Sequence, residues 1–419
     1  MDFVDFLREM LGITDDFAIT SIVKDEENKI IKIHLKYLNT HFVKEGKRYK
    51  LYDTTPEREW QHLNWFDYRC YLVCNLPRYL SEDGKPKVID IHFAPKYKGY
   101  THLFAAKVIE TLHKVKVQNT VAELMHTTPY VIRSIMESAV EKALLERGEV
   151  NDLEDISLDE KAYTHGHKYA TILIDSDKNC VVEMTEGRKE KNVKALFFSV
   201  NSQEKQPSLK RVNMDMWKPY INAIKDIAPQ AMIVHDKFHL FKKLSQAIDK
   251  TRRKEVKETE LLKGQKYTVL KNEENRTEEQ QRAFEQMLSE NLLTAKAWQI
   301  RENFKYLFSL KDCIAINYEL WKNNAISQSI TAVNEVIKTF DNHLQGIINA
   351  IVTQTSSGKH ENMNGKIQSV ISKARGFLNF ERFRINTLFY FGNLKFSSQK
   401  ISNALFFYSK NRFKRYNPL

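Results

Sequence analysis

The sequence lacks several features that mark particular protein classes. Four cysteines in 419 residues are too few for a disulfide framework. No apolar run approaches the roughly 20 residues of a membrane-spanning helix. The N-terminus, MDFVDFLREM, carries acids early and lacks the basic-then-apolar pattern of a signal peptide. We therefore expect a cytoplasmic globular protein with no membrane partner.

The cysteines also give little support for a metal knuckle. Cys70 and Cys74 have the spacing C-x3-C, and no second pair follows them. A structural zinc site usually takes four ligands from two such pairs. Bound zinc is therefore not expected.

Positive charge is in excess. Lysine and arginine number 65 against 53 acids, which gives a net charge of +12. An excess of this size suits a polyanionic partner, because cationic side chains release counterions from a phosphate backbone. Many basic proteins bind no nucleic acid, so charge alone leaves that alternative open.

The first 150 residues divide into two parts. Residues 1–98 predict a small β-rich domain, with strands at 29–37, 68–75 and 87–93. Residues 99–150 predict a helix-turn-helix, in which a short helix at 121–125 precedes a second helix with Pro129 in its first turn and Thr128 as N-cap. An ordinary helical hairpin is the alternative. We expect one face of the second helix to be apolar through Val131, Ile135 and Val140.

The rest of the chain predicts an α/β core with a helical insertion. Three successive strands, then strands alternating with helices, are typical of a ribonuclease-H-like plan. We assign 151–245 to the first part of this core, 246–345 to an all-α insertion, 346–395 to the last part of the core and 396–419 to a basic, aromatic tail. The expected strands are 156–163, 168–174, 181–185, 211–214 and 231–234, with helices at 189–198, 217–227 and from Gly358 to near Gly376.

Three acids stand where a two-metal phosphoryl-transfer site needs carboxylates. Asp159 lies inside the first core strand, Asp215 follows the strand at 211–214, and Glu361 lies in the first turn of the helix that Gly358 opens. Each also has a structural explanation: an exposed strand face, a helix N-cap and a favourable helix dipole, respectively. Asp236 and His239 follow the last strand at i, i+3 spacing, where the histidine is expected to be an ordinary helix residue.

Several blocks of the sequence resemble DDE transposases of the ISL-three group of bacterial insertion sequences, distant relatives of the Mutator-like transposases. The blocks are ISLDEKAYTHGHKYATILID, EGRKEKNV, VNMDMWKPYINAIKDIAPQAMIVHDKFHLFKKL, LLKGQKYTVL and SSGKHENMNGKIQSVISKARGFLNFERFR, between about residues 155 and 395. WQHLN at Trp60 and the helices at 121–140 match more loosely.

The resemblance implies a ribonuclease-H-like fold and a catalytic, metal-binding triad of Asp159, Asp215 and Glu361. The triad would hold two Mg²⁺ (or Mn²⁺) ions for DNA cleavage and strand transfer at terminal inverted repeats. Asp236 and His239 match an accessory D-x-x-H element. Asp236 is a rival for the second acid, but we prefer Asp215 because in this plan that acid follows the fourth strand.

The resemblance also has implications for partners. The family's N-terminal zinc ribbon is degenerate here, so we expect a ribbon-like β domain without zinc. Double-stranded DNA, as terminal repeats and target, is the expected partner, and pairing two ends implies a homodimer or larger assembly near the nucleoid of a bacterial cell. A domesticated, non-catalytic DNA-binding regulator and a purely hydrolytic nuclease are the alternatives. The expected DNA contacts are Arg133, Lys250, Arg252, Arg253, Lys366, Lys373 and Arg375.

Overall fold

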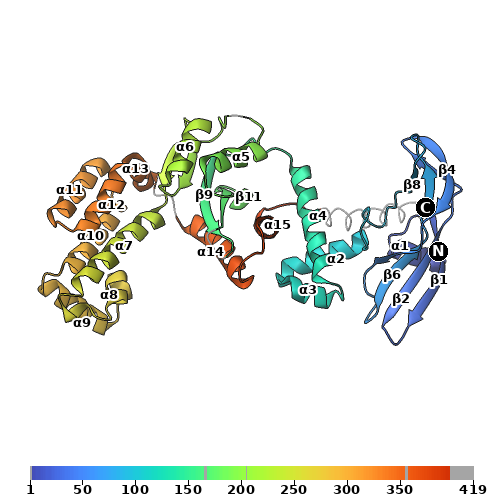
Figure 1. The fold of residues 1–419 in the computed structure, drawn as a ribbon, viewed down its shortest axis with the longest axis horizontal. Coiled ribbons are helices and arrows are strands. Elements are labelled where there is room, and N and C mark those ends of the chain that lie inside the picture. Colours follow the sequence, from blue (N-terminus) through green and yellow to red (C-terminus); the bar gives the residue numbers. More distant parts are fainter. Residues whose placement is uncertain (1, 165–167, 204, 354–356, 397–419) are drawn as a thin grey trace, which may run out of the picture. The chain divides into compact units, whose positions relative to one another are not determined.

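The computed structural model describes residues 2–164, 168–203, 205–353 and 357–396, without the side chains of 357–361. The chain divides into two compact units (Figure 1). Among the described residues, the first contains those up to Arg147 together with Leu394–Phe396, and the second is Gly148–Asn393. The finer domain boundaries expected from the sequence stay predictions. The expected tail at 397–419 lies outside the described residues.

The first unit begins with two four-stranded sheets. Their orders are β1-β2-β6-β5 and β3-β4-β7-β8. The expected strands at 29–37 and 68–75 are present as β2 and β6, but the third, at 87–93, was wrong because the extended chain ends at Val88. Helix α1 was not expected, and Leu7 of this helix packs into the core beside Trp60. The elements are α1 (Phe3–Met10), β1 (Phe17–Asp25), β2 (Ile30–Tyr37), β3 (His41–Lys44), β4 (Lys47–Thr54), β5 (Arg58–Gln61), β6 (Arg69–Cys74), β7 (Pro77–Leu80) and β8 (Pro86–Val88).

Cys70 and Cys74 both lie on β6 and both are buried. Burial raises the pKa of the Cys70 thiol to about 12 and that of Cys74 to about 11. Both cysteines belong to the apolar core of this unit.

Three helices follow the sheets: α2 (His102–Val115), α3 (Gln118–Leu124) and α4 (Pro129–Arg147). Thr128 caps α4 as expected, since its hydroxyl accepts a hydrogen bond from the Val131 amide at 3.3 Å. The expected apolar face was partly wrong: Val131 is half-exposed, and the buried row is Ile132, Ile135, Met136, Val140 and Ala143. The turn before α4 is tied to the sheet by Gln61, whose amide donates to the carbonyls of Met125 and His126.

A five-stranded mixed sheet forms the centre of the second unit, with the order β11-β10-β9-β12-β13. The first three strands pair antiparallel, whereas β12 and β13 run parallel to β9. The apolar residues of one sheet face pack with α5 and α6 into one core that includes Leu158, Val193 and Ile224. The elements are β9 (Asp155–Ala162), β10 (Tyr169–Asp175), β11 (Cys180–Glu186), α5 (Glu190–Val200), β12 (Arg211–Met214), α6 (Lys218–Ile227) and β13 (Met232–His235).

Helices alone follow β13 over the described residues. Those from α7 to α13 share a second core, which includes Leu244, Phe304 and Phe340. The chain then returns to the sheet through α14 and α15, and Arg384 of α15 pairs with Glu183 of β11 at 2.6–2.7 Å. The elements are α7 (Lys237–Glu255), η1 (Glu260–Leu262), α8 (Lys266–Leu270), η2 (Glu273–Asn275), α9 (Glu278–Ser289), α10 (Leu293–Leu307), α11 (Ile314–Ser327), α12 (Thr331–Asp341), α13 (Leu344–Thr353), α14 (Ser357–Lys373) and α15 (Phe380–Phe391).

No helix among the described residues has the length and apolar character needed to cross a membrane.

Candidate active site

Two of the predicted acids occupy matching positions on neighbouring parallel strands, where β12 has just ended and β9 continues to Ala162. The last register pair of β9 and β12 is Leu158 with Met214. Asp159 and Asp215 each follow one residue later, so they occupy matching positions. Adjacent strands are about 4.8 Å apart. The backbone therefore brings these two carboxylates to one locality although 55 residues separate them in sequence.

Asp159 is buried, with 9% of its surface exposed. Its Oδ1 accepts a hydrogen bond from the Glu160 amide at 2.8 Å. Its Oδ2 accepts none from the described residues, although Lys161 Nζ lies 2.7 Å away as a counter-charge. This ammonium lies at hydrogen-bond distance and compensates the buried charge of the carboxylate.

Asp215 forms an ion pair with His239, and the distance from Oδ2 to Nδ1 is 3.2 Å. Burial by itself raises the pKa of Asp215, but the hydrogen bond and charge of His239 outweigh it and leave the pKa below its usual value. Burial lowers the pKa of His239, but the hydrogen bond and charge of Asp215 have the larger effect, so the pKa of His239 is raised above its usual value. Asp159 and Asp236 act on His239 in the same direction. His239 is therefore a helix residue whose ring is satisfied by a carboxylate, and that carboxylate is Asp215.

The two rival acids, Asp215 and Asp236, differ in whether they cap a helix. Asp236 caps α7, because its Oδ1 accepts a hydrogen bond from the Phe238 amide at 2.9 Å. Asp215 caps no helix: the N-cap of α6 is Trp217, and the Asp215 Oδ1 contacts only the next amide, that of Met216, at 2.6 Å. The structural explanation expected for Asp215 thus applies to Asp236 instead.

Glu361 belongs to the backbone of α14, but its side chain lies outside the described residues. The inner face of this helix is formed by Met363, Ile367 and Ile371, all buried. Asn364 is three residues after Glu361, on the same side of the helix. Its Oδ1 is buried and accepts no hydrogen bond from the residues that the structure describes.

The described side chains form no group of three or more His, Cys, Asp or Glu residues that could hold a metal ion. Because the carboxylate of Glu361 is not among them, Asp159 and Asp215 supply the described part of the predicted triad. Their oxygens are the hard donors that Mg²⁺ and Mn²⁺ prefer.

The predicted DNA-contacting residues lie on three helices. Arg133 is half-exposed on α4. Lys366 and Lys373 are exposed on α14, and Arg375 follows it. On α7, Lys250 and Arg253 are exposed, whereas Arg252 is largely buried and its guanidinium binds Asp249 at 2.8 Å.

Beside Asp215 lies an aromatic cluster that the sequence motifs did not single out. The Arg188 guanidinium contacts the rings of Tyr169 and Trp217, at 4.3 Å and 5.0 Å from their centroids. Arg188 belongs to the block EGRKEKNV and Trp217 to VNMDMWKPY. Their presence in these blocks was the only sequence signal, because contact between them depends on tertiary structure.

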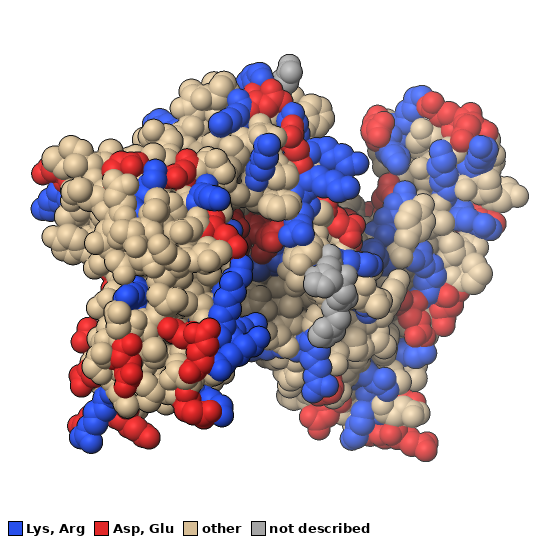
Figure 2. All heavy atoms as spheres, turned by 60° about the vertical axis from the view of Figure 1, so that its left-hand side comes forward, with Lys and Arg blue, Asp and Glu red and all other residues tan. Residues whose placement is uncertain are grey.

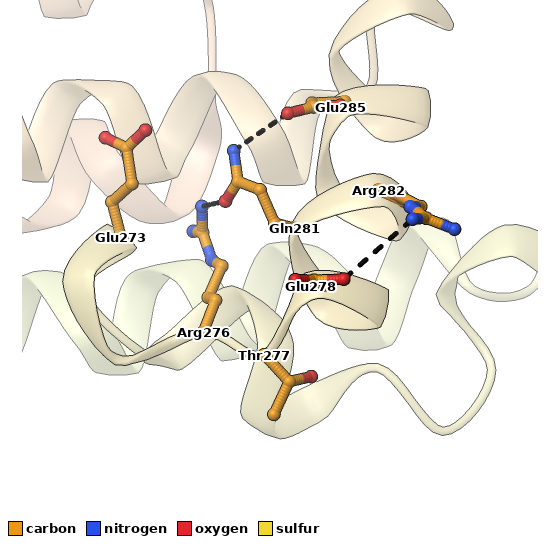
Figure 3. A pocket seen from close by; sticks show the side chains of 7 residues that line it. All are labelled: Glu273, Arg276, Thr277, Glu278, Gln281, Arg282 and Glu285. Carbon is orange, nitrogen blue, oxygen red and sulfur yellow. Dashed lines mark hydrogen bonds and ion pairs between the residues drawn. The ribbon is translucent and has the colours of Figure 1, made fainter.

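The helices α7–α13 are called the helical lobe below. This lobe has an open hollow of about 490 Å³ (Figure 3), and both acidic and basic side chains line it. Glu278 pairs with Arg282 at 3.9 Å and Arg276 binds Gln281 at 3.3 Å. This mixture of acids and bases is poorly suited to a phosphate backbone. Residues that line the hollow are Glu273, Arg276, Thr277, Glu278, Gln281, Arg282 and Glu285.

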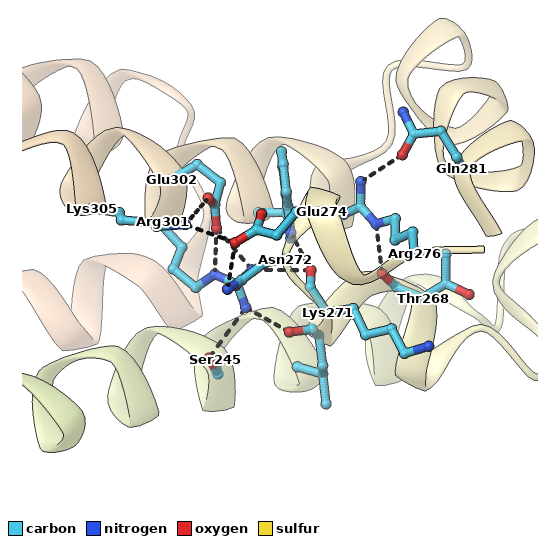
Figure 4. A network of polar contacts seen from close by, with 12 residues as sticks. Ser245, Thr268, Lys271, Asn272, Glu274, Arg276, Gln281, Arg301, Glu302 and Lys305 are labelled. Atoms are coloured by element: carbon cyan, nitrogen blue, oxygen red, sulfur yellow. Dashed lines mark hydrogen bonds and ion pairs between the residues drawn. The ribbon is translucent and has the colours of Figure 1, made fainter. Parts of the chain in front are cut away.

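A polar network beside this hollow explains the block LLKGQKYTVL (Figure 4). Arg301, only 3% exposed, donates to the carbonyls of Leu270 and Lys271 at 2.9 Å and 3.2 Å. Arg276 donates to the carbonyl of Thr268 at 3.1 Å. These arginines satisfy the free carbonyls at the C-terminus of α8, so the block has a structural role in the lobe.

Comparison with known proteins agrees with the resemblance. Residues 156–387, more than half of the chain, match the ISL3 model of DDE transposases, described as transposase. The transposase for insertion sequence element IS1001 of Bordetella parapertussis is 24% identical over 393 residues, covering 90% of this chain and 96% of that protein. The transposase for insertion sequence element IS1557 of Mycobacterium tuberculosis is 23% identical over 362 residues, covering 79% and 81%. The chain therefore belongs to the ISL3 family of insertion-sequence transposases.

Proposed function

We propose that this transposase cuts and joins DNA at the terminal inverted repeats of its element, with Asp159, Asp215 and Glu361 as the catalytic, metal-binding triad. The observation that carries the proposal is the matching position of Asp159 and Asp215 on neighbouring parallel strands. The mixed sheet order supports a ribonuclease-H-like core, and the run of helices between β13 and α14 supports the insertion predicted at 246–345 before Glu361.

The donor set fits divalent cations such as Mg²⁺ or Mn²⁺. The Asn364 Oδ1 is a buried acceptor without a hydrogen-bond donor among the described residues, and the Asp159 Oδ2 has the Lys161 ammonium beside it. Bound cations would supply charge at the attacking and leaving oxygens of an in-line displacement. His239 holds the Asp215 carboxylate in place through its Nδ1. Lys161 provides the counter-charge at Asp159 when no cation is bound.

Helix α7 has a polar and basic face along which the DNA backbone could run away from this site. His239, Lys242, Gln246, Lys250 and Arg253 fall within an arc of about 80° on one helix face, over about 21 Å of its length. All but His239 are exposed. The ion pairs of Lys250 with Glu335 and Arg253 with Asp249 involve exposed cations. The pair of Lys250 with Glu335 is exposed on both sides and contributes little, so a phosphate can replace Glu335. Arg253 is exposed but Asp249 is buried, and Arg252 still neutralises Asp249 when Arg253 binds a phosphate.

Basic side chains gather along one side of the helical lobe in Figure 2. We therefore propose Lys250 and Arg253 as phosphate contacts. Arg252 points off the arc and is bound to Asp249, so its expected contribution is to fix Asp249.

The remaining expected contacts would engage other parts of the DNA. Helices α3 and α4 have the plan of a helix-turn-helix, and the half-exposed Arg133 would reach the terminal repeat from α4. Lys366, Lys373 and Arg375 would contact backbone near Glu361. Pairing two ends requires at least two copies of the chain, so a dimer or larger synaptic assembly is proposed.

A strand-transfer assay on inverted-repeat DNA with Mg²⁺ or Mn²⁺ tests the proposal. Asp159→Ala, Asp215→Ala and Glu361→Ala are each expected to abolish product and to leave end binding intact. Asp226→Ala, at an exposed acid of α6, is the matched control and should retain activity. Full activity of any triad variant would remove that residue from the triad. End binding by the wild type without metal-dependent cleavage would instead favour a DNA-binding regulator.

A further inference from the structure

We infer that Trp217 is a binding platform for a single unpaired nucleobase of the DNA strand that passes Asp215; the inference rests on the proposed function. Trp217 lies two residues after Asp215, at the N-cap of α6. It remains 41% exposed. A large aromatic side chain kept in water beside a candidate active site has apolar surface available for a ligand.

The indole ring is held in a fixed orientation. Its Nε1 donates a hydrogen bond to the carbonyl oxygen of Arg188 at 3.1 Å. This bond uses the only donor of the indole, so the exposed part of the ring offers stacking surface and no polar group. A ring that is already oriented loses little conformational entropy when a ligand binds.

A guanidinium supports the ring from the protein side. Arg188 Cζ lies 5.0 Å from the centroid of Trp217, within the range of a cation–π contact. Arg188 is itself held by the Glu160 carboxylate, whose oxygens are 3.2 Å and 3.3 Å from Nη1. Tyr169 covers the guanidinium from a further side, at 4.3 Å. The platform is therefore built in advance by the protein.

Residues of the platform are close in sequence to Asp159 and to Asp215. Glu160 is the residue after Asp159 on β9, and Trp217 follows Asp215 by two residues. A strand with its phosphate at these acids would place a neighbouring base within reach of the indole. The ligand class follows from the chemistry: every base has a flat π-face, and stacking on an aromatic residue tolerates any sequence.

The test uses the full chain and inverted-repeat duplexes with a mismatch placed in turn at each position around the cut. Trp217→Ala is expected to lower the cleavage rate on matched DNA by about 10- to 100-fold, the usual worth of one stacked base. Trp217→Phe should keep most of the rate. A mismatch at one position should restore the Trp217→Ala rate, because the base is then already unpaired. Phe198→Ala, at an aromatic residue of α5 that is 64% exposed, is the matched control and should leave the rate unchanged.

A binding measurement without divalent cation separates stacking from catalysis. Fluorescence anisotropy with a labelled single-stranded oligonucleotide should show about tenfold weaker binding for Trp217→Ala than for wild type or Phe198→Ala. Equal cleavage and equal binding by folded Trp217→Ala would overturn the inference, and so would a loss of rate that no mismatch restores. If the wild type itself cleaves no DNA, the proposed function fails, and the anisotropy comparison still decides whether Trp217 binds bases.

Discussion

Replacing Asp236 by alanine and by asparagine separates the two roles open to this carboxylate. As a helix cap, Asp236 needs only an oxygen that accepts from the Phe238 amide. An asparagine side chain supplies that oxygen, whereas alanine does not. As a metal ligand it would need the negative charge, which asparagine lacks. The two substitutions therefore give opposite patterns for the two roles.

The cost of losing the cap follows from the structure. The bond from the Phe238 amide to Oδ1 is 2.9 Å long, and removing an N-cap of this kind costs about 1 kcal/mol. For a unit of the size of residues 148–393, that lowers the melting temperature by about 2–4 °C. Asp236→Ala should show this shift in thermal unfolding, and Asp236→Asn should melt with the wild type.

Strand transfer by the same proteins completes the comparison. Asp236→Asn is expected to retain most of its activity, because the cap is intact and no catalytic charge is lost. Asp215→Asn is expected to be inactive although folded, since its amide oxygen still accepts from the Met216 amide. A folded but inactive Asp236→Asn, together with an active Asp215→Asn, would show that the assignment of the second acid is wrong.

Three further predictions concern stability. Gly346→Ala should lower the free energy of unfolding of the second unit by about 1–3 kcal/mol in denaturant, because its Cβ would lie 2.4 Å from a ring carbon of His235. Gly365→Ala has open space around it and should be neutral or stabilising. Equal effects of the two substitutions would refute the steric argument. Arg301→Met should cost about 2 kcal/mol by leaving the Leu270 carbonyl unpaired and removing a partner of Glu302, whereas the Lys271 carbonyl keeps Trp298 Nε1 as a donor; Arg282→Met, at an exposed position, should change the stability little, and a mild effect at both positions would contradict the role of the network. Burial lowers the pKa of His62 to about 4. Below about pH 6.5 the imidazole is therefore protonated in the unfolded state while it is still neutral in the folded state, and this difference favours unfolding. Between pH 7 and pH 5 the free energy of unfolding of the wild type should therefore fall by about 2 kcal/mol more than that of His62→Gln. Parallel pH profiles of the two proteins would contradict the role given to His62.

The sequence predicted the strands of the core because their patterns are local. The strand expected at 211–214 is β12 to the residue, and alternation or β-branched runs mark the others to within two residues. Local patterns of this kind require no knowledge of partners. The strand expected at 87–93 fails for a different reason: its partner β7 has only four residues, Pro77–Leu80, and pairs with β8 only as far as Val88.

The chemistry around the acids could not be predicted in the same way. Both Asp215 and Asp236 precede helices, and only the structure shows which one caps and which one meets His239. The contact between Arg188 and Trp217 joins two segments that are 29 residues apart. Pairings of this kind depend on tertiary packing, so sequence alone supplied candidate residues without their partners.

The run of helices from α7 to α13 leaves the sheet and returns to it at a single strand. Strand β13 ends at His235, and α7 begins two residues later. The return helix α13 lies against the same strand, because the Asn349 amide donates to the carbonyl of Ile233 at 2.8 Å and Gly346 approaches the His235 ring. Only glycine permits that approach, since a Cβ there would meet the ring. Because α7 begins directly after β13 and α13 lies against the same strand, the length of this helical run does not determine where α14 begins. The long sequence separation of Glu361 from the two aspartates therefore does not oppose the proposed single site.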